Sequence, residues 1–169
     1  MASESGHTSV IEILLLNKAN IEAPNELKYT PIHCASENGH SLVVDILLSN
    51  KANIETQEKK FQFTPLHTAS KNGHSAIVEM LLSNKAYIEA QDTKFKYTPL
   101  HFASISGHAS IVEILLSNKA NIISQDKNKY TPLHMASQNG HPLVVEVLLS
   151  HNANIESLQN NQYTPLHIA

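Results

Sequence analysis

The stretch TPLHTASKNGH, residues 64–74, decides the fold because it recurs along the chain. The strings TPIHCASENGH, TPLHFASISGH and TPLHMASQNGH begin at Thr30, Thr98 and Thr131, and a shortened copy, TPLHIA, begins at Thr164. Successive Thr-Pro pairs are therefore 34, 34, 33 and 33 residues apart. Self-similarity at a period of this size is typical of repeat proteins, in which each copy is one supersecondary unit.

Each copy predicts a first helix and a second helix joined by a turn. Thr30 is a favourable N-cap, and Pro31 stands at the first helical position, where its missing N–H costs no hydrogen bond. Gly39 suits the left-handed residue that ends a helix. A second helix is predicted over about residues 41–50, where apolar residues recur with a period of 3.6. In the fourth copy Pro142 falls where this second helix should begin, which is the place where a helix accepts proline.

Neither helix of a copy can bury its apolar side chains alone. Each copy has about five or six large apolar side chains, and each would contribute about 1.5–3 kcal/mol when buried. Neighbouring copies must therefore cover one another. The repeat length varies only between the Ala after the second helix and the next Thr-Pro pair, which marks that segment as a loop.

The T-P-L-H-x-A core, the Gly-His pair and the Leu-Leu before the loop resemble the ankyrin repeat over essentially the whole chain. The resemblance implies an all-α fold, an α-solenoid of stacked helix–turn–helix repeats with β-hairpin-like loops. We expect a single array over residues 1–169, with a partial repeat at 1–25, complete repeats at about 26–58, 59–92, 93–125 and 126–158, and a partial repeat at 159–169. Because neither end has a polar capping repeat, we expect a segment of a longer array.

Two departures from the family pattern concern glycine. The family has Gly after the second helix, where this chain has Lys18, Lys51, Lys85, Lys119 and Asn152. A left-handed non-Gly residue costs about 1–2 kcal/mol, so we expect mild strain there. The family also has Gly two residues before Thr-Pro, where this chain has Lys28, Gln62, Lys96, Lys129 and Gln162. We therefore expect less tight hairpin tips.

The composition argues against several partner classes. The net charge is −3, and all twelve basic residues are lysine, which weighs against nucleic-acid recognition because that favours the bidentate Arg guanidinium. No apolar run is long enough for a membrane span, and the N-terminus lacks the layout of a signal peptide. Cys34 is the only cysteine, which fits a reducing compartment, and we expect a cytoplasmic protein.

The eleven histidines raise the question of metal binding or catalysis. Ten of them recur at fixed positions of the repeat, and no acidic or thiol ligand stands at a fixed spacing from them. A zinc site needs three or four converging ligands. We expect the set after Thr-Pro to bind the Thr hydroxyl and backbone groups of the adjacent loop through both ring nitrogens: His33, His67, His101, His134 and His167. We expect the set after Gly to accept a backbone N–H at the start of the second helix: His7, His40, His74, His108 and His141.

Other candidate chemical groups also have structural interpretations. One acid per copy occupies the same slot of the second helix and is expected on a solvated outer face: Glu12, Asp45, Glu79, Glu113 and Glu146. Cys34 has no evident His–Asn partner set. No catalytic loop or phosphate-binding motif occurs. We expect no enzyme activity, no metal site and no cofactor.

In a repeat protein the slots that differ between copies carry recognition. The resemblance implies that these slots face a concave groove and the loop tips, so we expect a protein–protein interaction scaffold. Apolar residues with a lysine rim indicate a partner site. The candidate partner-binding residues are Phe61, Phe63, Lys71, Lys94, Phe95, Tyr97, Phe102, Ile105, Met135 and Gln138. An alternative for the aromatic column before Thr-Pro is simple packing of loop against loop.

Two further interpretations stay open. The chain could be a regulatory or targeting segment of a larger enzyme or channel, with no ligand of its own. Its uncapped terminal repeats could also stack end to end with other copies. The sequence identifies neither the partner nor the native number of repeats.

Overall fold

The Thr-Pro pairs begin the first helices, as predicted. Thr30, Thr64, Thr98 and Thr131 are N-caps in extended backbone, and proline is the first residue of α2 (Pro31–Glu37), α4 (Pro65–Asn72), α6 (Pro99–Ser106) and α8 (Pro132–Gln138). A 3-10 helix, η1 (Pro165–His167), begins in the same way. Gly39, with a φ of 76°, takes the left-handed conformation that ends α2.

The second helices also begin where the sequence predicts. They are α1 (Thr8–Leu16), α3 (Ser41–Ser49), α5 (Ser75–Ser83), α7 (Ala109–Ser117) and α9 (Pro142–Ser150). In α3 the side chains of Val43, Val44 and Leu47 are buried while Asp45 is exposed. This one-sided burial is what a helical period of 3.6 residues requires. Pro142 is the first residue of α9, as expected.

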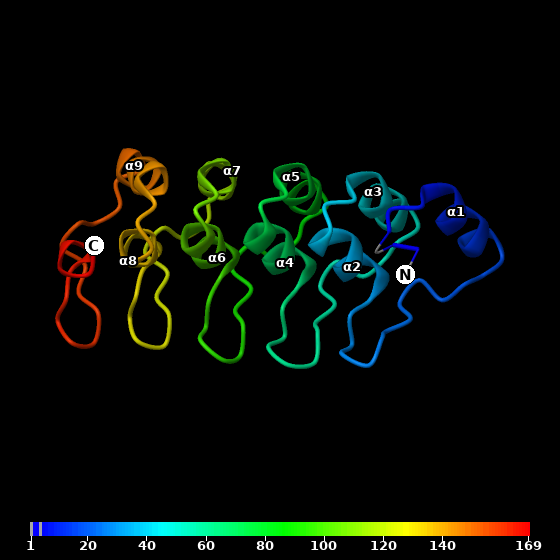
Figure 1. Cartoon of the computed structure of the whole chain (residues 1–169), viewed down its shortest axis with the longest axis horizontal. Helices are drawn as coiled ribbons and strands as arrows, with labels where there is room; N and C mark the ends of the chain where they lie inside the picture. The colour runs from blue at the N-terminus through cyan, green and yellow to red at the C-terminus, as the bar shows by residue number, and fades with distance from the viewer. Residues whose placement is uncertain (1, 4) are drawn as a thin grey trace. The chain divides into compact units, whose positions relative to one another are not determined.

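The computed structural model describes residues 2–3 and 5–169, which fall into unit 1 (Met1–Tyr87) and unit 2 (Ile88–Ala169). In unit 1, α2 packs on α3 and α4, α4 packs on α5, and α3 contacts α1 and α5. In unit 2, α6 packs on α7 and α8, and α9 packs on α7 and α8. Within each unit the second helices form one layer over the first helices (Figure 1).

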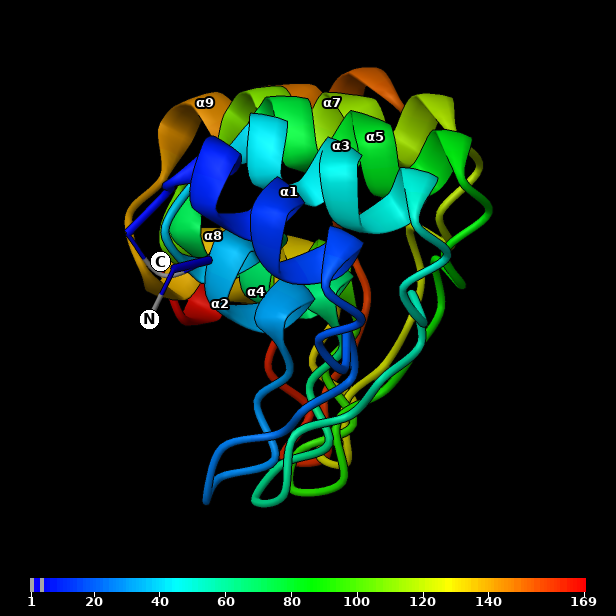
Figure 2. The ribbon, with the colours of Figure 1, turned by 90° about the vertical axis from the view of Figure 1, so that its right-hand side faces the viewer.

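The end-on view in Figure 2 shows α1, α3 and α5 above α2 and α4, with the loops of unit 1 extending away from both layers. The described residues contain nine α-helices and no strand, so the predicted all-α class of paired, stacked helices is confirmed. The core of each unit consists of side chains less than 2% exposed, among them Ile32, Leu47, Leu66, Ile77 and Leu81 in unit 1 and Leu100, Ile111, Leu115 and Leu148 in unit 2.

The loops before the Thr-Pro pairs fold back like hairpins. The Asn25 N–H donates to the Tyr29 carbonyl at 3.0 Å, and equivalent bonds close the later loops. In copies of 34 residues these two partners are five positions apart instead of four, as in Asp92 and Tyr97. Neighbouring loops are joined through their backbones, for example by the Lys127 N–H, which donates to the Phe95 carbonyl at 2.9 Å within unit 2.

Lysine, glutamine or asparagine takes a left-handed conformation at both places where the family pattern has glycine. The φ angle is between 60° and 68° at these ten positions, which include Lys85 and Lys28. We expected less tight hairpin tips. The tip of the first loop is nevertheless closed, because the Lys28 N–H donates to the Asn25 carbonyl at 2.9 Å. The physical reason is that the Asn25 Oδ1 also accepts from the Leu27 and Tyr29 N–H groups and so holds the turn closed.

Three buried serines on the first helices lack hydrogen-bond partners among the described residues. The hydroxyls of Ser36, Ser70 and Ser104 are fully buried, one in each of α2, α4 and α6. A buried polar group without a partner costs about 1–3 kcal/mol because it has lost its hydrogen bonds to water. Alanine would fill nearly the same space without this cost.

We therefore expect Ser104→Ala to stabilise the protein by about 1 kcal/mol. The matched control is Ser124→Ala, because Ser124 is also buried but its hydroxyl has acceptors within reach, the Asn121 carbonyl at 2.7 Å and a Glu89 carboxylate oxygen at 3.1 Å. That variant should lose about 1 kcal/mol. Urea denaturation followed by far-UV circular dichroism measures both changes, and a loss of stability in Ser104→Ala would contradict the explanation.

Candidate functional site

The histidines after Thr-Pro use both ring nitrogens, as expected. The His33 Nδ1 accepts from the Thr30 N–H at 3.3 Å and lies 3.0 Å from the Thr30 hydroxyl. Because Nδ1 accepts, the ring proton is on Nε2, which donates to the Phe63 carbonyl of the next loop at 2.9 Å. In unit 2 the rings of His101 and His134 make the same pairs of contacts, to the carbonyls of Tyr130 and Tyr163.

Burial keeps these histidines neutral. Removal from water lowers the pKa of His33 and His134, and it lowers the pKa of His101 to about 4. The hydrogen bond to the Tyr130 carbonyl opposes the shift at His101 but is the weaker effect. Both ring nitrogens are already occupied. Among residues 2–3 and 5–169, no three His, Cys, Asp or Glu side chains are placed to hold a metal ion.

We expect protonation of the buried histidines to unfold the protein as the pH falls. The unfolded His101 side chain takes up a proton near pH 6.5, whereas the folded one does so only near pH 4. Protons therefore favour the unfolded state across this interval. The His101 contribution should be complete above about pH 7 and should fall by about 3 kcal/mol by pH 4.

Urea denaturation at a series of pH values measures this effect. The variant His101→Gln should have a lower free energy of unfolding at neutral pH but a flatter dependence on pH. The control His7→Gln, at an exposed side chain, should keep the wild-type slope. An unchanged slope in His101→Gln would contradict the assignment.

The histidines after Gly do not act as predicted. His7, His40, His74, His108 and His141 are the N-caps of the second helices, but none has a side-chain capping bond among the described residues. Instead, the Nε2 of His74 bonds to the Glu37 carbonyl at 2.9 Å, one copy back. The ring covers Gly39, where a Cβ would lie 2.7 Å from the His74 ring. The Gly-His pair therefore works between copies, since the ring of one copy packs on the glycine of the copy before it.

The sequence did not reveal the role of the residue at the start of each loop turn, the slot held by Asp92. Asp92 is 2% exposed, and its Oδ1 accepts from the N–H groups of Lys94 and Phe95 at 2.7 and 2.8 Å. Its Oδ2 accepts from the Tyr97 N–H at 2.7 Å. The same slot holds Asn25, Glu58, Asp126 and Gln159, each of which accepts from loop N–H groups. An oxygen-bearing residue four or five positions before each aromatic residue was the available signal.

The acids of the second helices are on the exposed side, as expected. Glu12, Asp45, Glu79, Glu113 and Glu146 are all exposed. Glu113 lies 3.1 Å from the Nε2 of His151 in the same unit. An exposed pair of this kind contributes little to stability. Glu113 is on a second helix, α7, and is therefore apart from the loop tips of its unit.

In unit 1 the candidate partner-binding residues are Phe61, Phe63 and Lys71. The two rings stack with centroids 5.3 Å apart, and both are partly exposed. The Lys71 Nζ lies 5.9 Å from the centroid of Phe63, and its side chain is exposed on the last turn of α4. These three residues thus form one accessible cluster at the base of a loop.

In unit 2 the remaining candidate partner-binding residues differ in their exposure to solvent. Lys94 and Gln138 are exposed, and Phe95, Tyr97 and Ile105 are partly exposed. Phe102 and Met135 are only 7% and 4% exposed, so the expectation that they stand at the surface is wrong. The reason is visible at Phe102, whose ring packs edge-on against Tyr97 with centroids 5.5 Å apart. In this copy the aromatic residue before Thr-Pro therefore covers the variable slot of the first helix.

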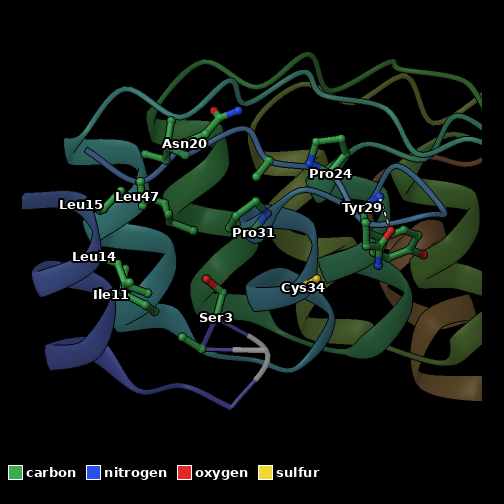
Figure 3. Close-up of a pocket in the computed structure, with 15 residues that line it drawn as sticks. Ser3, Ile11, Leu14, Leu15, Asn20, Pro24, Tyr29, Pro31, Cys34 and Leu47 are labelled. Carbon is green, nitrogen blue, oxygen red and sulfur yellow. Dashed lines mark hydrogen bonds between the residues drawn. The ribbon is translucent and has the colours of Figure 1, made fainter. Parts of the chain in front are cut away.

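A pocket of about 410 Å³ lies in unit 1 beside Cys34 (Figure 3). Ile11 and Leu14 of α1, Leu47 of α3 and Pro31 of α2 supply much of its apolar wall. Tyr29 also lines it, and burial together with the charge of Glu37 raises the pKa of its phenol to about 12. The residues that line this pocket include no His, Asp or Glu.

Two family models match this chain. A model described as ankyrin repeats (3 copies) matches residues 1–92 and 100–169, and one described as ankyrin repeats (many copies) matches residues 76–116. A search of curated proteins gives no match for the chain. No helix within the described residues is both long and apolar enough to cross a membrane. Ankyrin repeats are typically protein–protein interaction modules and are generally not catalytic. Since the matches cover nearly the whole chain and the paired helices follow the same period, this protein belongs to the ankyrin repeat family.

Proposed function

We propose that this chain is a non-enzymatic scaffold that binds another protein through its first-helix face and loop tips. The observation that carries the proposal is one slot of the first helix, two residues before each Gly. It holds Glu37, Lys71, Ile105 and Gln138, which are exposed or partly exposed. An acid, a base, an aliphatic and an amide side chain thus occupy equivalent accessible positions.

The repeated residues have structural duties that account for their recurrence. Thr64 and His67 form a capping box at the start of α4, and Gly39 makes room for the ring of His74. The side chains of Ile105 and Gln138, which differ between copies at an accessible slot, are not part of the capping box or of the glycine–histidine contact. In a scaffold built of equivalent copies, these are the side chains that can select a partner without disturbing the packing between copies.

The partly exposed aromatic side chains are a second argument for a partner-binding surface at the first helices and loops. In unit 2, Phe95 and Tyr97 stack with centroids 5.1 Å apart, and Ile105 is at the end of the helix that follows them. Aromatic side chains with an apolar neighbour and a polar rim are typical of binding hot spots. The single cysteine supports a reducing compartment such as the cytoplasm as the place of action.

The test is the combined variant Ile105→Ala and Gln138→Ala. We expect it to reduce partner capture by about tenfold or more, because it removes two accessible side chains of the proposed face. The measurement is affinity capture from lysate with quantitative mass spectrometry. Phe102→Ala is not suitable, because truncation of this buried ring should itself cost about 3–5 kcal/mol.

The matched control is Leu143→Ala, which truncates a side chain that is 65% exposed on the second helix α9. Both variants should keep the wild-type urea midpoint. Equal capture by wild type and by the double variant would remove this face from the proposal. Absence of any captured protein with the wild-type chain would remove the scaffold function itself.

A further inference from the structure

The lysines of this chain are concentrated at the loop tips. Seven of the twelve lie between the residue whose side-chain oxygen accepts from the loop N–H groups, such as Asp92, and the next Thr-Pro pair. They are Lys28, Lys59, Lys60, Lys94, Lys96, Lys127 and Lys129. The acids of the second helices are on the other side of each unit, on the exposed outer layer. In each unit the lysines of the loops are therefore apart from the acids of the second helices.

Carboxylates close to the tips of unit 2 are turned inward. Asp92 and Asp126 are 2% and 6% exposed, and their oxygens accept from backbone N–H groups of their own loops. Lys94 and Lys127 are exposed in the same loops. The carboxylates of these loops are thus buried and hydrogen-bonded to backbone N–H groups, whereas the lysine side chains are the charged groups exposed at the tips.

Two of these ammonium groups share one aromatic ring. The Nζ atoms of Lys94 and Lys127 lie 4.5 and 4.4 Å from the ring centroid of Phe95. Lys94 is next to Phe95 in sequence, whereas Lys127 comes from the following loop, which is bonded to the first through the Phe95 carbonyl. The ring attracts both cations, but two like charges near one ring repel each other. The Asp126 carboxylate offsets part of this repulsion at Lys127, and a carboxylate of a partner would offset more of it.

We propose that the loop tips at residues 92–97 and 126–130 bind an acidic segment of a partner protein, with carboxylates at Lys94 and Lys127 and an apolar side chain on Phe95. This inference rests on the proposed scaffold function and specifies the chemistry of its partner. The exposed Lys96 and Lys129 are in the same loops and would contact acidic residues that flank the central ones.

A protein segment fits these tips better than nucleic acid or a membrane. Nucleic-acid recognition favours the guanidinium fork, and this chain has no arginine. Membrane association through a positive surface needs an accompanying apolar insertion or a broad polybasic patch. The tips instead combine a few point charges with one half-buried ring. That combination matches a short stretch of acidic and apolar side chains.

The experiment is selection from a phage-displayed library of random peptides of about 12 residues on the immobilised full chain. We expect the selected peptides to be enriched about threefold or more in Asp and Glu, placed on either side of an apolar residue. Fluorescence anisotropy on one synthesised peptide then gives its Kd. Added salt should weaken this binding because the contacts are between exposed charges.

The test variant is Lys94→Gln with Lys127→Gln, which should raise the Kd about tenfold, equivalent to about 1.4 kcal/mol, because it removes two exposed charge contacts together. The control is Lys85→Gln with Lys119→Gln, which removes the same charge at the turns that follow α5 and α7, outside the loop-tip segments. It should change the Kd less than about twofold.

Several outcomes would overturn the inference. They are the absence of selected peptides, selected peptides without acidic enrichment, and an equal loss of binding in the control pair. Tighter binding of single-stranded DNA or of phosphatidylserine vesicles at Lys94 and Lys127 would also overturn it. The scaffold function would survive these results if protein capture still depended on Ile105 and Gln138. It would fail separately if the wild-type chain captured no protein.

Discussion

The structure depends on the neutral histidine that links one copy to the next. In His33 one ring nitrogen closes the cap of its own first helix, and the other reaches the Phe63 carbonyl of the following loop. A single side chain therefore satisfies the N–H of the buried N-cap Thr30 and fixes the spacing between copies. Both bonds require the uncharged ring, so the same burial that makes the link geometrically stable makes it sensitive to acid.

The fold was predictable because its signals are local and repeated. Thr30, Pro31 and Gly39 mark a helix start and a helix end by backbone preferences that act within a few residues. The partner of the His74 ring was not predictable from one copy, since it lies 37 positions earlier at the Glu37 carbonyl. The position of Phe102 was missed for a related reason, since Tyr97 folds over it only in three dimensions.

The candidate partner-binding residues illustrate the same division between local and non-local information. Variation among copies correctly drew attention to accessible positions such as Lys71 and Gln138. It also selected Met135, because a slot that differs between copies can be buried when each copy fills the space with a different side chain. The lysine tips were noted only as a rim, because the inward orientation of Asp92 is invisible in sequence.

The histidine link has a consequence for how such chains change length. Its acceptor in the next copy is a main-chain oxygen, supplied by Phe63 in one place and by Tyr130 or Tyr163 in others. Every amino acid offers that oxygen, so no matched pair of side chains must be inherited together. When whole modules are duplicated, deleted or exchanged by recombination, this bond can consequently form at the new junction without a compensating substitution at its acceptor.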